Sequence, residues 1–273
     1  MRIRERLGAW IRPALRRGRD ERPADAAAPG CRALLDGKTA LVTGGGRNIG
    51  RSIALAMAEQ GATVLFTDVN AGRCRAVEAE LRAVRAGARG FVSDVSRAAD
   101  NDALVAALRA QATVPDILVN NVGLDSEDFE TTYRTNVFGP MQLTKACAGM
   151  MIAGGIEGSI VFVTSIHQET VRRVAAYSSS KAAVAMIVKE MALDLAPHRI
   201  RVNGIAPGFV KEDAAGNGEP HPDTPLGQTS IPPRYIGQAA VFLAADHFSR
   251  FTTGSIFTID AGLSLVNYFG ARR

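Results

Sequence analysis

The stretch Thr39-Ala-Leu-Val-Thr-Gly-Gly-Gly-Arg-Asn-Ile-Gly50 decides the fold. Its first five residues form an apolar run that is too short for a helix and suits a buried strand. The glycines follow at once, and apolar residues at helical spacing then continue to Gly61. A strand, a glycine turn and a helix N-terminus form an anion site, because backbone N–H groups and the helix dipole meet there. The stretch therefore predicts a nucleotide-binding β–α unit.

A second predicted strand, Thr63–Thr67, ends at Asp68, eighteen residues after Gly50. A carboxylate at this place can accept hydrogen bonds from the hydroxyls of an adenine ribose. The alternative interpretation is a glycine-rich turn beside a surface aspartate. The distance from the glycine turn favours the ribose interpretation.

Strand and helix signals then alternate along the chain, which is typical of a doubly wound parallel sheet. The further strands are expected at 90–93, 117–120, 159–164, 200–205 and 255–259, with a helix over 177–195. The predicted fold is a single α/β domain of the Rossmann type, with seven parallel strands and helices on both faces. It is expected to span residues 37–273, after an N-terminal extension over residues 1–36.

The motif Tyr177-Ser-Ser-Ser-Lys181 places a phenol and an ammonium one helical turn apart. A nearby positive charge favours the phenolate, so the pair can exchange a proton with a substrate hydroxyl or carbonyl. The pattern alone is common by chance. It gains weight from its place after the nucleotide signature, and from Ser165 at the carboxyl end of a predicted strand, where open α/β sheets bind ligands.

An ordered set of motifs resembles the short-chain dehydrogenase/reductase family. These are Thr43-Gly44-x-x-x-Asn48-Ile49-Gly50, Asp94-Val95, Asn120-Asn121-Val122-Gly123, Asn136, Ser165, Tyr177-x-x-x-Lys181 and Pro207-Gly208. The likeness runs from about Gly37 to Leu265. The resemblance implies a Rossmann fold and hydride transfer between a nicotinamide and a carbonyl or alcohol.

The resemblance also implies a role for each site residue. Tyr177 is the expected general acid/base, Lys181 lowers its pKa and holds the nicotinamide ribose, Ser165 binds the reacting oxygen, and Asn136 anchors a water relay. The expected cofactor-binding residues are Gly44, Arg47, Asn48, Ile49, Gly50, Asp68, Asp94, Val95, Asn121, Gly123, Tyr177, Lys181, Pro207, Gly208 and Val210. Structural alternatives are a strand-end cap for Ser165, a helix N-cap for Asp94 and an irregular helix position for Asn136.

Several departures from the family pattern concern the substrate and the phosphate turn. Asn48 replaces a glycine, which is tolerable because asparagine accepts left-handed geometry. Ser165 stands one residue closer to Tyr177 than usual, so Thr164 and His167 are alternative neighbours of the substrate oxygen. The segment 123–136 is short and acidic, and Glu212 stands near the place of a customary threonine. Both segments normally border the substrate, so its identity is left open.

Cofactor choice depends on two residues of opposite charge. Arg47 stands where NADP-preferring family members often carry a base, whereas the Asp68 carboxylate would repel a 2′-phosphate. We expect NAD(H), with NADP(H) the weaker alternative, because an ion pair between an exposed arginine and the 2′-phosphate would contribute little binding free energy. The expected activity is interconversion of a secondary alcohol and a ketone or aldehyde on a small or medium-sized substrate, as in 3-oxoacyl reductases or sugar and steroid dehydrogenases. The alternative is a nucleotide-sensing or interaction protein with little turnover.

Composition sets the broader class. The 273 residues are 47% hydrophobic and 22% charged, which suits one large domain. No run predicts a membrane span or a signal peptide. Cys31, Cys74 and Cys147 show no metal-ligand spacing, and the four histidines are scattered, so no metal site is expected. Cysteine usage favours a reducing cytoplasm.

The charge is concentrated at the N-terminus. Residues 1–22 carry eight arginines against three acids, which accounts for the whole net charge of +5. The rest of the chain is formally neutral, so no nucleic-acid partner is expected. Apolar residues every four positions in this segment fit weak peripheral contact with an anionic membrane surface. The favoured interpretation is a marginal helix on a flexible lead, with residues 23–30 as a linker.

Two segments are more apolar than one domain requires. Residues 182–188 are apolar on more than one face of their predicted helix, and residues 263–269 are too apolar to stay exposed to water. Family members commonly associate as tetramers through these two elements, so a homotetramer with two-fold axes is expected. The alternative is that both segments fold onto their own domain.

Overall fold

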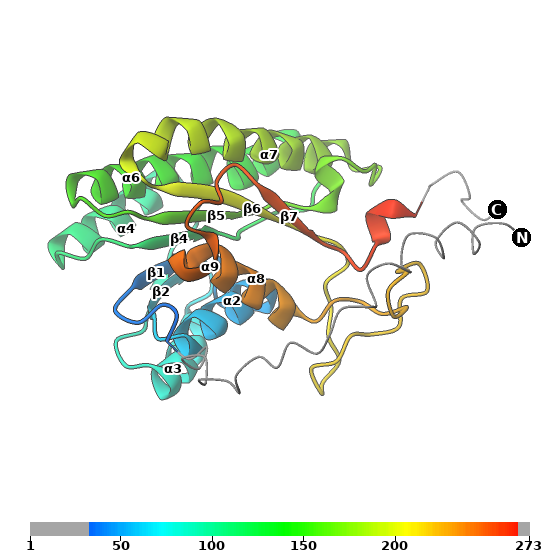
Figure 1. Cartoon of the computed structure of the whole chain (residues 1–273), viewed down its shortest axis with the longest axis horizontal. Coiled ribbons are helices and arrows are strands. Elements are labelled where there is room, and N and C mark those ends of the chain that lie inside the picture. Colours follow the sequence, from blue (N-terminus) through cyan, green and yellow to red (C-terminus); the bar gives the residue numbers. More distant parts are fainter. Residues whose placement is uncertain (1–32, 267–273) are drawn as a thin grey trace, which may run out of the picture. The chain divides into compact units, whose positions relative to one another are not determined.

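The computed structural model describes residues 33–266, and its centre is a seven-stranded parallel sheet (Figure 1). The strand order is β3-β2-β1-β4-β5-β6-β7. The strands are β1 (Thr39–Val42), β2 (Thr63–Asp68), β3 (Arg89–Val92), β4 (Ile117–Asn120), β5 (Ser159–Val163), β6 (Arg201–Pro207) and β7 (Ile256–Ile259). The predicted doubly wound fold with seven parallel strands is confirmed.

Helices cover both faces of the sheet (Figure 1). One face carries α2 (Asn48–Glu59), α3 (Ala71–Val84) and α8 (Pro233–Ala244), and the other carries α4 (Ala98–Ala110), α6 (Gly139–Ala153) and α7 (Ala175–Leu195). The shorter elements are α5 (Phe129–Tyr133), the π-helix η1 (Arg134–Phe138), α9 (Asp246–Ser249) and the 3-10 turns η2 (Ile166–Gln168), η3 (Ala196–His198) and η4 (Leu263–Leu265). None of the helices between residues 33 and 266 is long and apolar enough to cross a membrane.

The central strand β1 shows why the strands read as continuous apolar runs. Ala40 and Val42 pack into the hydrophobic cluster under α2 and α8, while Leu41 between them packs into the cluster under α4, α6 and α7. All three are fully buried. Because successive side chains of a strand point to opposite faces and both faces are covered, every position must be apolar.

The element bounds differ from the predicted ones by one or two residues at several ends. The helix expected to begin at Tyr177 begins at Ala175, and β3 begins at Arg89. Leu35, which was assigned to the extension, is 1% exposed and its N–H donates to the Gln60 carbonyl at 2.9 Å. The packed domain therefore begins before the predicted residue 37.

Two segments with predicted features lie outside the described residues. The basic amphipathic stretch, the linker and Cys31 fall within residues 1–32. The end of the apolar C-terminal segment falls within residues 267–273.

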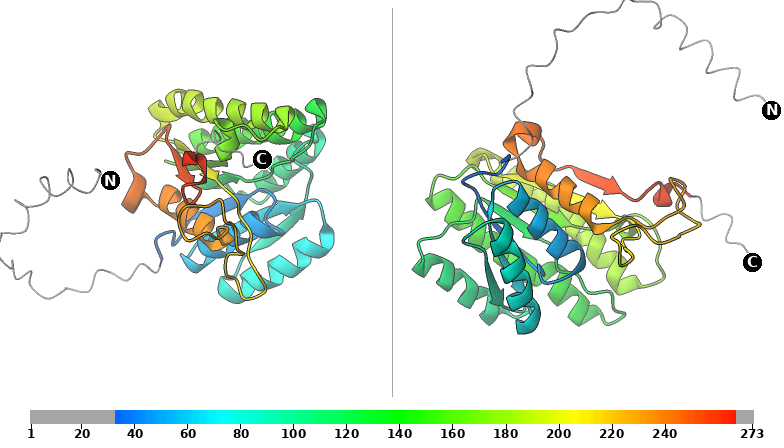
Figure 2. Two further views of the ribbon diagram at one scale, coloured as in Figure 1. Left: turned by 90° about the vertical axis from the view of Figure 1, so that its right-hand side faces the viewer. Right: turned by 90° about the horizontal axis from the view of Figure 1, so that it is seen from below.

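A long connection follows β6 at the carboxyl edge of the sheet. Residues 208–232 extend beyond the ends of β6 and β7 before the chain enters α8 (Figure 2). Isolated bridges join Val210 to Ile231 and Pro220 to Thr229. The Ser230 hydroxyl donates to the Lys211 carbonyl at 2.8 Å. These bonds fix the first residues of the connection next to the strand ends.

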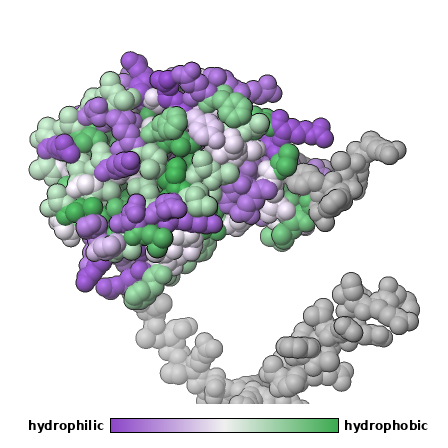
Figure 3. Space-filling model, turned by 90° about the horizontal axis from the view of Figure 1, so that it is seen from above, coloured by the Kyte–Doolittle hydropathy of each residue, from purple (hydrophilic) through white to green (hydrophobic). Residues whose placement is uncertain are grey.

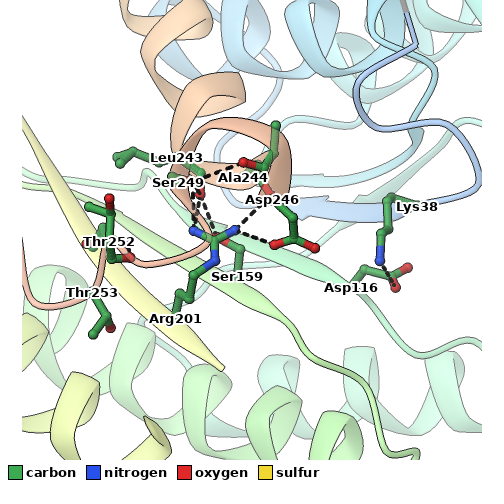
Figure 4. A network of polar contacts seen from close by, with 12 residues as sticks. Lys38, Asp116, Ser159, Arg201, Leu243, Ala244, Asp246, Ser249, Thr252 and Thr253 are labelled. Carbon is green, nitrogen blue, oxygen red and sulfur yellow. Dashed lines mark hydrogen bonds and ion pairs between the residues drawn. The ribbon is translucent and has the colours of Figure 1, made fainter. Parts of the chain in front are cut away.

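Buried Arg201 ties β6 to the end of α8 and to α9 (Figure 4). Its side chain is 8% exposed and donates to the carbonyls of Leu243 at 2.6 Å and Ala244 at 3.0 Å. It also bonds the Ser249 hydroxyl at 2.9 Å and the Asp246 carboxylate at 3.1 Å. Burial lowers the pKa of Arg201, and Asp246 acts against that shift. A buried guanidinium is tolerated here because its donors are largely satisfied.

Replacing Arg201 by Met is expected to lower the free energy of unfolding by about 3 kcal/mol, because it leaves buried carbonyls without their donor. The matched control is Arg199→Met, since that side chain is 73% exposed and forms an exposed ion pair with Glu157. The control should change stability by less than about 1 kcal/mol. Urea unfolding followed by circular dichroism measures both. Equal losses in the two variants would contradict the structural role of Arg201.

Candidate active site

The turn between β1 and α2 approaches its own helix so closely that glycine is required. A Cβ atom on Gly50 would lie 2.1 Å from the Gly44 carbonyl oxygen. Asn48 adopts the predicted left-handed geometry, with φ of +46°. The Asn121 side chain, at the end of β4, donates to the carbonyls of Thr43 at 2.9 Å and Gly44 at 3.3 Å. The turn is therefore held open between two strand ends, as an anion site requires.

A cavity of about 260 Å³ lies between this turn and the ends of β2, β3 and β4. Ten of the predicted cofactor residues line it: Gly44, Arg47, Asn48, Ile49, Gly50, Asp68, Asp94, Val95, Asn121 and Gly123. Four residues that the sequence analysis missed also line it: Val69, Arg73, Ser93 and Val122.

Asp68 sits in this cavity with one carboxylate oxygen already bonded. Its Oδ1 accepts from the Asn70 N–H at 2.9 Å and from two nitrogens of Arg73, at 2.6 and 3.0 Å. Its Oδ2 faces the glycine turn, where a Cβ on Gly46 would lie 2.4 Å away. Arg73 is one helical turn into α3, so a base five residues after the acid was the available sequence signal.

Asp94 does not cap a helix. Its Oδ1 accepts from the N–H and the hydroxyl of Ser96, and the helix α4 has Arg97 at its N-cap. The alternative interpretation of Asp94 as a helix N-cap is therefore wrong. Its carboxylate instead fixes the turn after β3 that forms one wall of the cavity.

A second cavity, of about 290 Å³, adjoins the first through their shared lining residues Ile49, Asn121 and Gly123. Its lining includes the remaining predicted cofactor residues and Ser165, but not Asn136: Ser165, Tyr177, Lys181, Pro207, Gly208 and Val210. It is also lined by Asp125, Val163, Thr164, Arg172 and Phe209. Every predicted cofactor residue thus lines one cavity or the other.

Lys181 is buried and has few polar partners. Its ammonium donates to the Val163 carbonyl at 3.0 Å and lies 5.7 Å from the centre of the Tyr177 ring. A Cβ on Gly123 would stand 3.1 Å from Nζ, so this glycine makes room for the ammonium. Burial lowers the pKa of Lys181 to about 8. The expected one-turn spacing from Tyr177 is confirmed.

The pKa of Tyr177 departs from the expectation. Burial raises it, and the hydrogen bond with Ser165 and the charge of Arg172 act in the opposite direction. Lys181 was expected to lower this pKa, and it is not among the causes of the shift. The Lys181 ammonium bonds the Val163 carbonyl.

Ser165 combines a structural and a site position. Its Oγ accepts from the His167 N–H at 3.2 Å, which makes it the N-cap of η2, and it lines the cavity beside Tyr177. The Thr164 hydroxyl donates to the Ile205 carbonyl at 3.0 Å. The His167 ring lies edge-on to Tyr177 with centroids 6.2 Å apart, and burial lowers its pKa. Ser165 is therefore the hydroxyl best placed to meet a ligand oxygen.

Asn136 lines neither cavity but fixes the segment between them. Its Oδ1 accepts from the Leu124 N–H at 2.7 Å, and its Nδ2 donates to the Leu124 carbonyl and the Ser180 hydroxyl, each at 2.9 Å. The residue lies in the π-helix η1, so its backbone position is irregular, as the structural alternative proposed. The wider turn aims the amide at the chain just after Gly123.

Replacing Lys181 by Met is expected to raise the free energy of unfolding near pH 7 by about 2 kcal/mol, because it removes a buried ammonium. The unfolded lysine has a pKa near 10.5, so between about pH 8 and 10.5 the unfolded state binds more protons and wild-type stability rises with pH. The advantage of the variant should therefore shrink from about pH 7 to 9.5. Urea unfolding across this range measures it.

The matched control is Lys189→Met, an exposed lysine on the same helix. It should show little change in stability and no pH dependence of that change. A Lys181→Met protein that is less stable than wild type at every pH would contradict the cost assigned to the buried charge.

Comparison with known proteins identifies the family of the chain. The sequence model of the family described as short chain dehydrogenase matches residues 38–222. The 7alpha-hydroxysteroid dehydrogenase of Escherichia coli strain K12 is 34% identical over 247 residues, which covers 84% of this chain and 94% of that protein.

Two solved structures have the same architecture. One is a 7 alpha-hydroxysteroid dehydrogenase complexed with NADH and 7-oxo glycochenodeoxycholic acid, with a TM-score of 0.77, 33% identity, and coverage of 84% of this chain and 96% of that one. The other is a gluconate 5-dehydrogenase from Burkholderia cenocepacia J2315 in complex with NADP and tartrate, with a TM-score of 0.77, 32% identity, and coverage of 87% and 99%. The chain belongs to the short-chain dehydrogenase/reductase family.

Proposed function

We propose that the protein is an NAD(H)-dependent oxidoreductase that interconverts a secondary alcohol and a ketone or aldehyde on a small or medium-sized molecule. The observation that carries this proposal is the meeting of Ser165, Tyr177 and Lys181 in one cavity that adjoins the cavity of the glycine turn. The names of the relatives, which include steroid and sugar-acid dehydrogenases, support an alcohol or carbonyl substrate.

When bound, the nicotinamide supplies or accepts a hydride at the reacting carbon. The Tyr177 hydroxyl gives a proton to the carbonyl oxygen in reduction and takes one from the alcohol in oxidation. Ser165 holds the same oxygen through a hydrogen bond and stabilises the charge that develops on it. The buried ammonium of Lys181 lies 5.7 Å from the centre of the Tyr177 ring and bonds the Val163 carbonyl, and its other N–H donors would hold the nicotinamide ribose.

Replacing Tyr177 by Phe should lower kcat by about 10²–10⁴-fold, because the ring still packs but the proton donor is lost. The affinity for NADH should change less than about threefold, since the variant keeps Lys181 and the glycine turn. Nicotinamide absorbance measures turnover with a panel of ketones, and NADH fluorescence measures binding. Lys181→Ala should weaken both.

The same experiment separates the enzyme from the alternative, a nucleotide-sensing or interaction protein. A sensor would bind NADH with wild-type and Tyr177→Phe proteins alike and would reduce none of the ketones. Near-normal turnover in Tyr177→Phe would instead mean that another group transfers the proton.

We propose NAD(H) rather than NADP(H) because the Asp68 carboxylate stands beside the proposed binding place of the adenine ribose. The geometry around Asp68 supports this: Arg73 and Asn70 hold Oδ1, and Oδ2 is left facing the glycine turn. A ribose hydroxyl could donate to that oxygen, whereas a 2′-phosphate would be repelled. Arg73 and Arg47 line the same cavity and limit this repulsion.

Replacing Asp68 by Ala should raise kcat/KM for NADP(H) relative to NAD(H) by about tenfold or more, because it removes the repulsion and frees Arg73 to meet a phosphate. Arg73→Gln is the paired control. It should reduce the use of NADP(H) and keep the preference for NAD(H), because Asp68 is still present. Steady-state kinetics with both cofactors measures the ratio. A wild-type kcat/KM clearly higher with NADP(H) would overturn the proposal.

We also propose a homotetramer with two-fold axes. Met186 and Leu193 on α7 are 55% and 75% exposed, and apolar side chains lie among polar ones on the face of α6 and α7 (Figure 3). Leu265, near the C-terminal end of the described residues, is 83% exposed. Burial of these side chains against other subunits would remove apolar surface from water. Light scattering should give about four times 28.9 kDa, and a monomer mass would contradict the proposal.

We further propose that the predicted catalytic domain over residues 37–273, with Leu35 packed onto it, is preceded by a separate basic extension and works in a reducing cytoplasm. The free, buried thiols of Cys74 and Cys147 support a reducing compartment. The concentration of positive charge in residues 1–22 supports at most a weak contact of the extension with an anionic membrane surface. The formally neutral remainder gives no support to a nucleic-acid partner.

A further inference from the structure

A charged pair forms part of the cavity that holds Tyr177. Asp125 comes from the chain that follows β4, and Arg172 comes from the chain between η2 and α7. Arg172 Nη2 lies 2.5 Å from Asp125 Oδ2, and the two side chains are 44% and 41% exposed. The pair therefore joins the two segments on either side of the cavity while staying accessible to a ligand.

The pair lies close to the reacting group. The Arg172 guanidinium carbon is 5.5 Å from the centre of the Tyr177 ring, and Ser165 lines the same cavity. A ligand whose oxygen reaches Tyr177 and Ser165 thus carries its neighbouring carbon toward the ion pair. The substituent on that neighbouring carbon must therefore interact favourably with both a guanidinium and a carboxylate.

The pair retains hydrogen-bonding capacity. Only Arg172 Nη2 and Asp125 Oδ2 make the ion pair, and no other hydrogen bond to either side chain is formed by residues 33–266. The guanidinium offers further N–H donors and the carboxylate a further acceptor oxygen. A hydroxyl can donate to the carboxylate and accept from the guanidinium. A carboxylate on the ligand can only accept, and it would face the charge of Asp125.

An apolar ligand is disfavoured for a different reason. A sterol skeleton laid against the pair would displace water from both charges without replacing the lost hydrogen bonds, and uncompensated desolvation of charges is costly. Hydroxyl groups on adjacent carbons can replace the hydrogen bonds that the displaced water made to the two charged groups.

We propose that the Asp125–Arg172 pair is a specificity-determining element that selects polyhydroxylated alcohols, such as sugar alcohols with a hydroxyl next to the reacting carbon. It disfavours both sterols and 2-hydroxy acids, whose carboxylate stands next to the reacting carbon. This inference rests on the proposed function, because it assigns the substrate class of the same cavity. Arg172 and Asp125 are positioning residues, whereas Tyr177 keeps the proton-transfer role.

The chain supplies a matched control for each partner. Arg173 is the adjacent arginine, but it lines a different cavity, on the outer side of the segment before α7. Glu127 is an exposed acid two residues after Asp125, and it forms no ion pair with residues 33–266. Arg173→Gln and Glu127→Gln therefore change the same charges without touching the pair.

The test compares full-length wild-type protein with Arg172→Gln, Asp125→Asn and the two controls, with NAD and three alcohols: sorbitol, lactate and cyclohexanol. Wild type should give the highest kcat/KM with sorbitol. Arg172→Gln and Asp125→Asn should each lower the sorbitol-to-cyclohexanol ratio of kcat/KM by about tenfold or more, mainly through KM for sorbitol. KM for NAD should stay the same, and both controls should keep the wild-type ratio.

The outcomes separate this inference from the proposed function. A wild-type enzyme that oxidises cyclohexanol or lactate as efficiently as sorbitol overturns the inference and leaves the oxidoreductase in place. So does an Arg172→Gln variant whose turnover falls equally with all alcohols, which is the pattern of a merely structural pair. A protein that binds NADH but oxidises none of the three alcohols contradicts both.

Discussion

The amide of Asn121 is the interaction on which the arrangement of the site depends. It joins the end of β4 to the first carbonyls of the glycine turn, at the point where the strand order reverses between β1 and β4. Because the chain leaves β1 for α2 on one face and leaves β4 for α6 on the other, an opening remains at the carboxyl ends of these paired strands. Asn121 lines both cavities, so the side chain that ties β4 to the glycine turn also lies between the two parts of the site.

Two buried cations show how stability and function place different demands on the same kind of group. Arg201 bonds two carbonyls, a hydroxyl and a carboxylate, so its burial holds β6 to α8 and α9. Lys181 is as deeply buried but donates only to the Val163 carbonyl. Lys181 lines the second cavity, and burial lowers its pKa to about 8. An under-satisfied buried charge of this kind is characteristic of functional sites.

The sequence was sufficient for the parts of the site that depend on local pattern. The turn before Gly50, the acid at Asp68 and the helical spacing of Tyr177 and Lys181 each follow from chain-neighbour geometry, and the structure brings them into adjoining cavities. Asn48 could likewise be assigned left-handed geometry from its residue type alone. The strands were predictable because a sheet covered on both faces needs apolar residues at every position.

What the sequence by itself determined was the order of strands and helices and the identity of the residues at their ends. Only the tertiary structure decided which charges meet. The contact of Arg172 with Asp125 joins residues of two separate segments, and no local pattern in either segment specifies the pair. The direction of the Tyr177 pKa shift was decided in the same way, because burial is a property of the packed chain. Local pattern fixes backbone geometry, whereas electrostatic environment arises from segments that packing brings together.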